Sequence, residues 1–150
     1  MSSYQRILLC YDATAVGRRT LRLGAHLARD LHGETHLLAV VDDTEWTRGV
    51  PVIPAVSFEL QERTAKDLLH EGVDELADLG VVAQRHLAVG NPMMEISAFA
   101  KALDIDLIVI GHHRSGRFYR WWTGQDESRL LDQVSCSVLV IMEPQELKTH

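Results

Sequence analysis

Four consecutive apolar residues, Leu107, Ile108, Val109 and Ile110, constrain the fold of this chain more than any other feature. Three of the four are β-branched, and Gly111 follows them directly. Such a run is typical of a strand that is buried on both faces, as in a parallel sheet covered by helices. A Gly after a buried strand permits a sharp turn and a close approach to the backbone. The sequence therefore predicts a central parallel strand, with the functional surface in the loop that follows it.

The rest of the chain alternates strand-like apolar runs with segments of helical periodicity. Strands are expected at residues 6–11, 35–41, 81–89, 107–110 and 138–142. The third of them is expected at a sheet edge, because its pattern is weaker and alternating. This alternation predicts an α/β domain with an open, Rossmann-like parallel sheet and helices on both faces, in three layers. We infer one domain, residues 1–150.

Helix boundaries follow from capping residues and breakers. The first helix should end near His32 and Gly33, with Gly33 as its C-cap. Prolines in residues 42–57 predict an irregular loop there, and a second helix is expected at 58–79. Asn91 is a suitable N-cap for a third helix, with Pro92 in its first turn. A short helix at 127–134 completes the set.

Composition excludes several functional classes. The net charge of −6 argues against general nucleic-acid binding, and no apolar run approaches the length of a membrane span. The N-terminus passes directly into a strand, which predicts a cytoplasmic protein without a signal peptide. Cys10 and Cys136 lie beside or within apolar runs, so buried thiols are expected rather than a disulfide.

An ordered set of segments resembles the universal stress protein family, especially its subgroup without a clear nucleotide motif. The segments that carry the resemblance are residues 7–12, 37–41, 90–96, 106–113 and 137–141. Together they span essentially residues 4–142. The resemblance implies a five-stranded sheet in the order 3-2-1-4-5. It also implies a homodimer joined along the last strand, from Val138 to Met142.

ATP-binding members of that family carry the motif Gly-x2-Gly-x9-Gly followed by Ser or Thr, whose backbone N–H groups cradle phosphates. Gly111 and Gly124 match the first and third Gly, but Arg114 occupies the second Gly position and Gln125 the hydroxyl position. Arg114 would either block the site or supply a positive charge to phosphate. Since half of the motif is altered, loss of tight ATP binding is expected and no cofactor is required.

The resemblance implies two further contacts in this candidate nucleotide pocket. Asp12 and the backbone of Val40 would face the ribose and adenine of a bound nucleotide.

Other chemical groupings have ordinary explanations. His112 and His113 are adjacent and would point in opposite directions on an extended segment, which is poor metal geometry, so no metal site is expected. His70 with Asp74 lacks the second His of a zinc-protease motif and is expected on a solvated helix face.

The basic and aromatic residues between Arg114 and Trp122 are either a packing or partner surface, which we favour, or an anion clamp.

Two functions remain from these observations. The first is a dimeric cytoplasmic stress-response module that acts through contacts with another protein, with little or no catalysis. The second is an ATP- or AMP-binding switch with weak ATPase activity. No nucleophile elbow and no Walker lysine are present in the sequence, so at most slow ATP hydrolysis is expected.

Overall fold

The computed structural model describes residues 4–11, 15–42, 55–112 and 128–142. Its centre is a five-stranded sheet in the order β3-β2-β1-β4-β5, in which every neighbouring pair is parallel. The strands are β1 Arg6–Cys10, β2 Glu34–Asp42, β3 Ala83–Gly90, β4 Leu107–His112 and β5 Ser137–Met142. The predicted fold class, strand order and edge position of the third strand are therefore confirmed.

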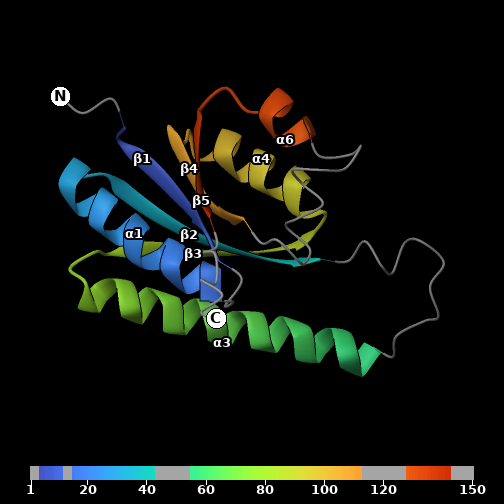
Figure 1. Cartoon of the computed structure of the whole chain (residues 1–150). Helices are drawn as coiled ribbons and strands as arrows, with labels where there is room; N and C mark the ends of the chain where they lie inside the picture. Colours follow the sequence, from blue (N-terminus) through green and yellow to red (C-terminus); the bar gives the residue numbers. More distant parts are fainter. Residues whose placement is uncertain (1–3, 12–14, 43–54, 113–127, 143–150) are drawn as a thin grey trace, which may run out of the picture.

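Helices cover both faces of this sheet, as the alternation of elements predicts. The helices are α1 Ala15–Leu31, α3 Ala55–Asp78, α4 Pro92–Ala102 and α6 Ser128–Gln133. Figure 1 shows α1 and α3 on one side of the strands and α4 with α6 on the other. Each side has its own apolar core: Leu9 and Leu76 belong to the first, and Leu8 and Ile96 to the second.

The alternation of core residues along β1 shows why the strand is buried on both faces. Ile7 and Leu9 point toward α1 and α3, and Leu8 points toward α4. All three are at most 1% exposed. The buried run Leu107 to Ile110 in β4 behaves in the same way, because its residues alternate between the same two cores.

One expected boundary and one expected cap residue were wrong, although α1 ends at Leu31, close to the expected end near His32 and Gly33. Helix α3 begins at Ala55, inside the expected loop 42–57. Pro54 directly precedes it, and a proline interrupts the interior of a helix but is compatible with its start. The residue with left-handed backbone after α1 is His32, at φ 53°, rather than Gly33. Gly33 instead provides space, since a Cβ there would lie 2.8 Å from Cδ1 of Ile7.

The start of α4 agrees with the prediction. Asn91 has extended backbone, and its Oδ1 accepts hydrogen bonds from the backbone N–H groups of Met93 and Met94, at 3.0 and 3.3 Å. Pro92 occupies the first turn, where no N–H is needed. In the described part of the chain, no helix is long and apolar enough to cross a bilayer.

Candidate functional site

The carboxyl ends of β2, β1 and β4 lie side by side at one edge of the sheet. The chain adds β2 and β3 on one side of β1, and α4 then leads to β4 on the other side. The strand order therefore reverses between β1 and β4. Ligands of open α/β sheets bind in the crevice outside the carboxyl ends of the strands, at such a reversal. This edge is the candidate functional site.

The structure places two of the predicted pocket residues at this edge. Ile7 pairs with Leu107 and Leu9 with Val109, and the same register carried further places Tyr11 beside Gly111. Val40 lies at the same edge on the other side of β1, two residues beyond the pair Cys10 and Leu38. The other predicted pocket residues, Asp12, Arg114, Gly124 and Gln125, lie outside the described residues, as does the loop from Arg114 to Trp122.

Tyr11 is a residue of this edge that the sequence reasoning did not use. It is 4% exposed, and its backbone N–H donates to the carbonyl oxygen of Leu38 at 2.9 Å. Burial and then the Glu71 carboxylate raise the pKa of its phenol, while a hydrogen bond with Arg18 acts in the opposite direction. The phenol is therefore neutral near pH 7 and serves as a hydrogen-bonding group, not as a base.

The position of Tyr11 depends on a close approach of α3. A Cβ at Gly72 of α3 would lie 3.4 Å from the ring of Tyr11 and 2.8 Å from Cδ2 of Leu37. The signal in the sequence is the period of two along β1, since Ile7, Leu9 and Tyr11 all belong to the core under α1 and α3. Tyr11 thus forms part of the buried core directly beneath the candidate functional site, at the end of β1.

The histidines singled out in the sequence do not form a metal centre in the described part of the chain. Within residues 4–11, 15–42, 55–112 and 128–142, no group of three or more His, Cys, Asp or Glu could hold a metal ion. His112 ends β4, and His113 lies outside the described residues. His70 and Asp74 form an exposed i,i+4 pair at 3.6 Å on α3, as expected for a solvated helix face.

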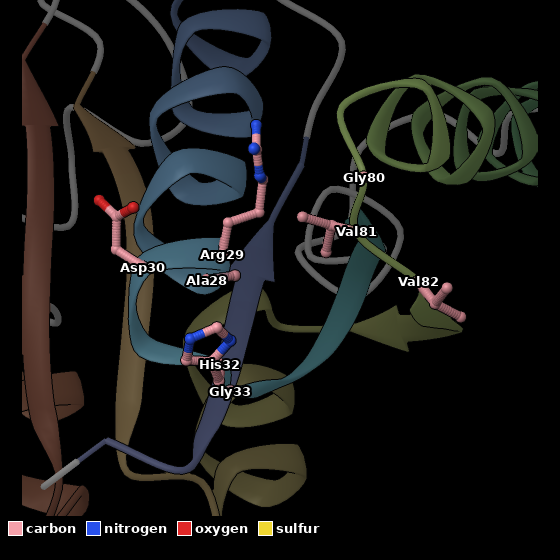
Figure 2. A pocket seen from close by; sticks show the side chains of 8 residues that line it. All are labelled: Ala28, Arg29, Asp30, His32, Gly33, Gly80, Val81 and Val82. Carbon is pink, nitrogen blue, oxygen red and sulfur yellow. The ribbon is translucent and has the colours of Figure 1, made fainter.

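A hollow of about 720 Å³ lies at the opposite end of the sheet. Figure 2 shows its lining from the end of α1, the turn into β2 and the turn into β3, with Arg29 directed along α1 and Asp30 pointing to the other side of that helix. The hollow lies at the amino ends of the strands. It is therefore separate from the edge at which α/β sheets bind ligands.

Comparison with known protein sequences gives consistent results. A model of the universal stress protein family matches residues 3–142. Universal stress protein MJ0531 of Methanocaldococcus jannaschii is 25% identical over 147 residues, which cover 95% of this chain and 85% of that protein. Universal stress protein YxiE of Bacillus subtilis is 24% identical over 146 residues, which cover 92% of this chain and 99% of that protein.

Solved structures share the fold. The protein MJ0577 superposes with a TM-score of 0.76 at 22% identity, covering 96% of this chain and 99% of that one. A universal stress protein in complex with cAMP has a TM-score of 0.67 at 15% identity, covering 94% and 98% of the two chains. A universal stress protein from Archaeoglobus fulgidus in complex with dAMP has a TM-score of 0.64 at 23% identity, covering 92% and 98%.

Proposed function

The chain belongs to the universal stress protein family, and on this premise we propose that it is a dimeric cytoplasmic module of the stress response. It acts through contacts with another protein and has little or no catalytic activity. Neither Cys10, which is buried, nor Cys136, which is partly buried, forms a disulfide in the described structure, which suits a reducing compartment. The observation that carries the proposal is the character of the outer strand β5.

β5 is an edge strand that exposes apolar side chains. In the described structure it pairs with β4 alone. Leu139 is 40% exposed and Met142 52% exposed, and the segment Ser137–Met142 contains no charged residue. An uncharged, apolar edge invites pairing with another strand, and two-fold self-pairing covers it.

The other sheet edge also exposes an apolar side chain, Val89 at 38%, but it is not uncharged. β3 carries exposed Gln84 and the charged Arg85, and charged side chains discourage edge pairing. This asymmetry supports β5, with Val138 to Met142, as the dimer surface.

Sedimentation of matched variants tests the dimer. Leu139→Asp places a charge on the proposed surface, and Val89→Asp places one on the opposite edge, where Val89 is 38% exposed. We expect the wild type and Val89→Asp to sediment at twice the 16.9 kDa chain mass at micromolar concentration, and Leu139→Asp to sediment as a monomer. Dimers of equal strength in all three proteins would refute the β5 interface.

The second candidate function is binding of an adenine nucleotide at the carboxyl edge. Gly111 and Val40 flank the end of β1 at the point where the strand order reverses. The solved relatives with cAMP and dAMP add support. We propose that Arg114 and Gln125 weaken this activity in the present chain, because they replace a Gly and a hydroxyl of the family motif.

Titration calorimetry with ATP and magnesium decides the role of the altered motif. Two restored contacts, at about 1.5–3 kcal/mol each, predict that Arg114→Gly with Gln125→Ser binds at least roughly a hundredfold more tightly than the wild type. Tight binding by the wild type, weakened by Arg114→Gly alone, would instead identify Arg114 as a phosphate ligand. The nucleotide switch would then replace the binding module as the main function.

A further inference from the structure

Two histidines form a hydrogen-bonded pair between β2 and β3, on the face of the sheet that α4 covers. Nδ1 of His36 lies 2.9 Å from Nε2 of His86, and Nε2 of His36 lies 2.8 Å from Oε1 of Glu34. His36 is 2% exposed. The ring of His86 contacts Phe99 of α4 at a centroid distance of 5.4 Å. The pair therefore joins the edge strand β3, its neighbour β2 and the helix α4.

The geometry defines where the protons lie when both rings are neutral. The Glu34 carboxylate can only accept, so His36 carries its proton on Nε2. Nδ1 of His36 is then an acceptor, and His86 must donate to it from Nε2. Nδ1 of His86 is left as the site for an added proton. If both rings were charged, two N–H groups would face each other across 2.9 Å.

Few charges surround the pair in the described structure. Glu34 contacts Nε2 of His36, on the side of the ring away from His86. The same carboxylate forms an ion pair with Arg6 of β1 at 3.7 Å, and Arg6 also pairs with Asp104 at 3.5 Å.

The ionisable residues of β3 and α4 have other positions. Glu95 of α4 lies against Gly90, at the end of β3, and Lys101 is exposed. Arg85 of β3 pairs with His70 of α3, on the other face of the sheet. Among the described residues, a proton added to His86 therefore meets the apolar ring of Phe99 and a second histidine, and no carboxylate contacts His86 directly.

We propose that the His36–His86 pair is an acid-sensitive latch that holds β3 and α4 on the sheet at neutral pH and releases them on acidification. This inference rests on the fold and not on the proposed function. Asp42 pairs with Gly90 at the carboxyl end of β3, directly before the cap residue Asn91. Release of β3 and α4 would therefore change the part of the candidate functional site that contains Val40.

The sign of the effect follows from proton linkage. Burial, and then the neighbouring His36, lower the pKa of His86 from its ordinary value. The released state thus binds more protons than the closed state. The stabilisation from the pair is complete above the unfolded pKa of about 6.5 and is lost as the pH falls through the lower pKa of the folded state.

Nuclear magnetic resonance on the wild-type protein tests the latch. We expect His86 to titrate below about pH 6.5. We also expect amide protection factors in β3 and α4 to fall more than those in β1 between about pH 7.5 and 5.5, by up to about tenfold, because a group with an unfolded pKa of about 6.5 can change the opening equilibrium by no more than about tenfold at one pH unit below that value. A His86 pKa at or above the ordinary value, or an equal loss of protection in all strands, would overturn the proposal.

A matched pair of variants isolates the titrating group. In His86→Gln the amide can still donate to Nδ1 of His36 but does not titrate. Protection in β3 should then stay constant between the two pH values. His70→Gln removes an exposed histidine and should retain the wild-type loss of protection. Persistence of the acid effect in His86→Gln would refute the latch, and the wild-type titration decides the matter if that variant does not fold.

Discussion

Among single residues, Asp106 connects more of the sheet than its place at the end of a turn suggests. Its Oδ2 accepts hydrogen bonds from the backbone N–H groups of Gln5 and Arg6, both at 2.9 Å. Its backbone carbonyl accepts from Ser137 at 3.1 Å, at the start of β5. One residue therefore fixes the beginning of β1 relative to β4 and β5. The sequence shows the Asp, but it does not show which backbone groups donate to it, because Gln5 and Arg6 lie about a hundred positions away in the chain.

Removal of this carboxylate should destabilise the protein. Asp106→Ala leaves two backbone donors without their acceptor, so we expect the free energy of unfolding in urea to fall by about 1–3 kcal/mol. Asp106→Asn retains one acceptor oxygen and should lose less than half of that amount. Equal losses in the two variants would show that the two hydrogen bonds are not the source of the stability.

Among the elements, three helices end with the same backbone arrangement. After α1, α3 and α4 a residue with positive φ follows: His32 at 53°, Gly80 at 86° and Asp104 at 55°. In each case the next N–H bonds to a carbonyl five residues back, as Gly33 does to Ala28 at 3.1 Å. This is the Schellman motif, in which Gly is favoured at the left-handed position. Two of the three positions therefore carry a side chain that strains the backbone.

Relief of this strain at the end of α1 should stabilise the protein. His32→Gly puts the favoured residue at φ 53°, and we expect the free energy of unfolding to rise by about 0.5–1 kcal/mol. His26→Gly is the matched control, because His26 is exposed in the interior of the same helix. It should lower the free energy of unfolding by about the same amount. A loss of stability in both variants would show that a contact of His32 raises the free energy of unfolding by more than the backbone strain lowers it.

This helix end also shows a limit of sequence reasoning. The sequence has a Gly where the helix ends, but a Gly can be required either for a left-handed backbone conformation or for the close approach of another residue. Gly33 serves the second purpose, against Ile7, and the neighbouring His32 takes the strained conformation. The N-cap Asn91 was predictable because its role depends on residues within one helical turn.

For the whole molecule, the topology was predictable and the polar contacts were not. Long apolar runs at residues 7–9 and 107–110 identify strands buried on both faces, and alternation with helices predicts a parallel sheet. The order of the strands came from family resemblance. The pairing of His36 with His86 and the packing of Tyr11 under α3 were not predicted, because each depends on strand register or helix approach between distant segments.

The most direct test of the proposed dimer is hydrogen exchange at the two edges of the sheet in the wild-type protein. β3 and β5 are both edge strands in the isolated chain, so each has backbone N–H groups that its single neighbour does not pair. We expect those of β3 to exchange rapidly and those of β5 to be protected to the level of the central strand β1, because a second copy pairs with Val138 to Met142. Equally rapid exchange at both edges, at a protein concentration of about 100 μM, would contradict the dimer and the function proposed from it.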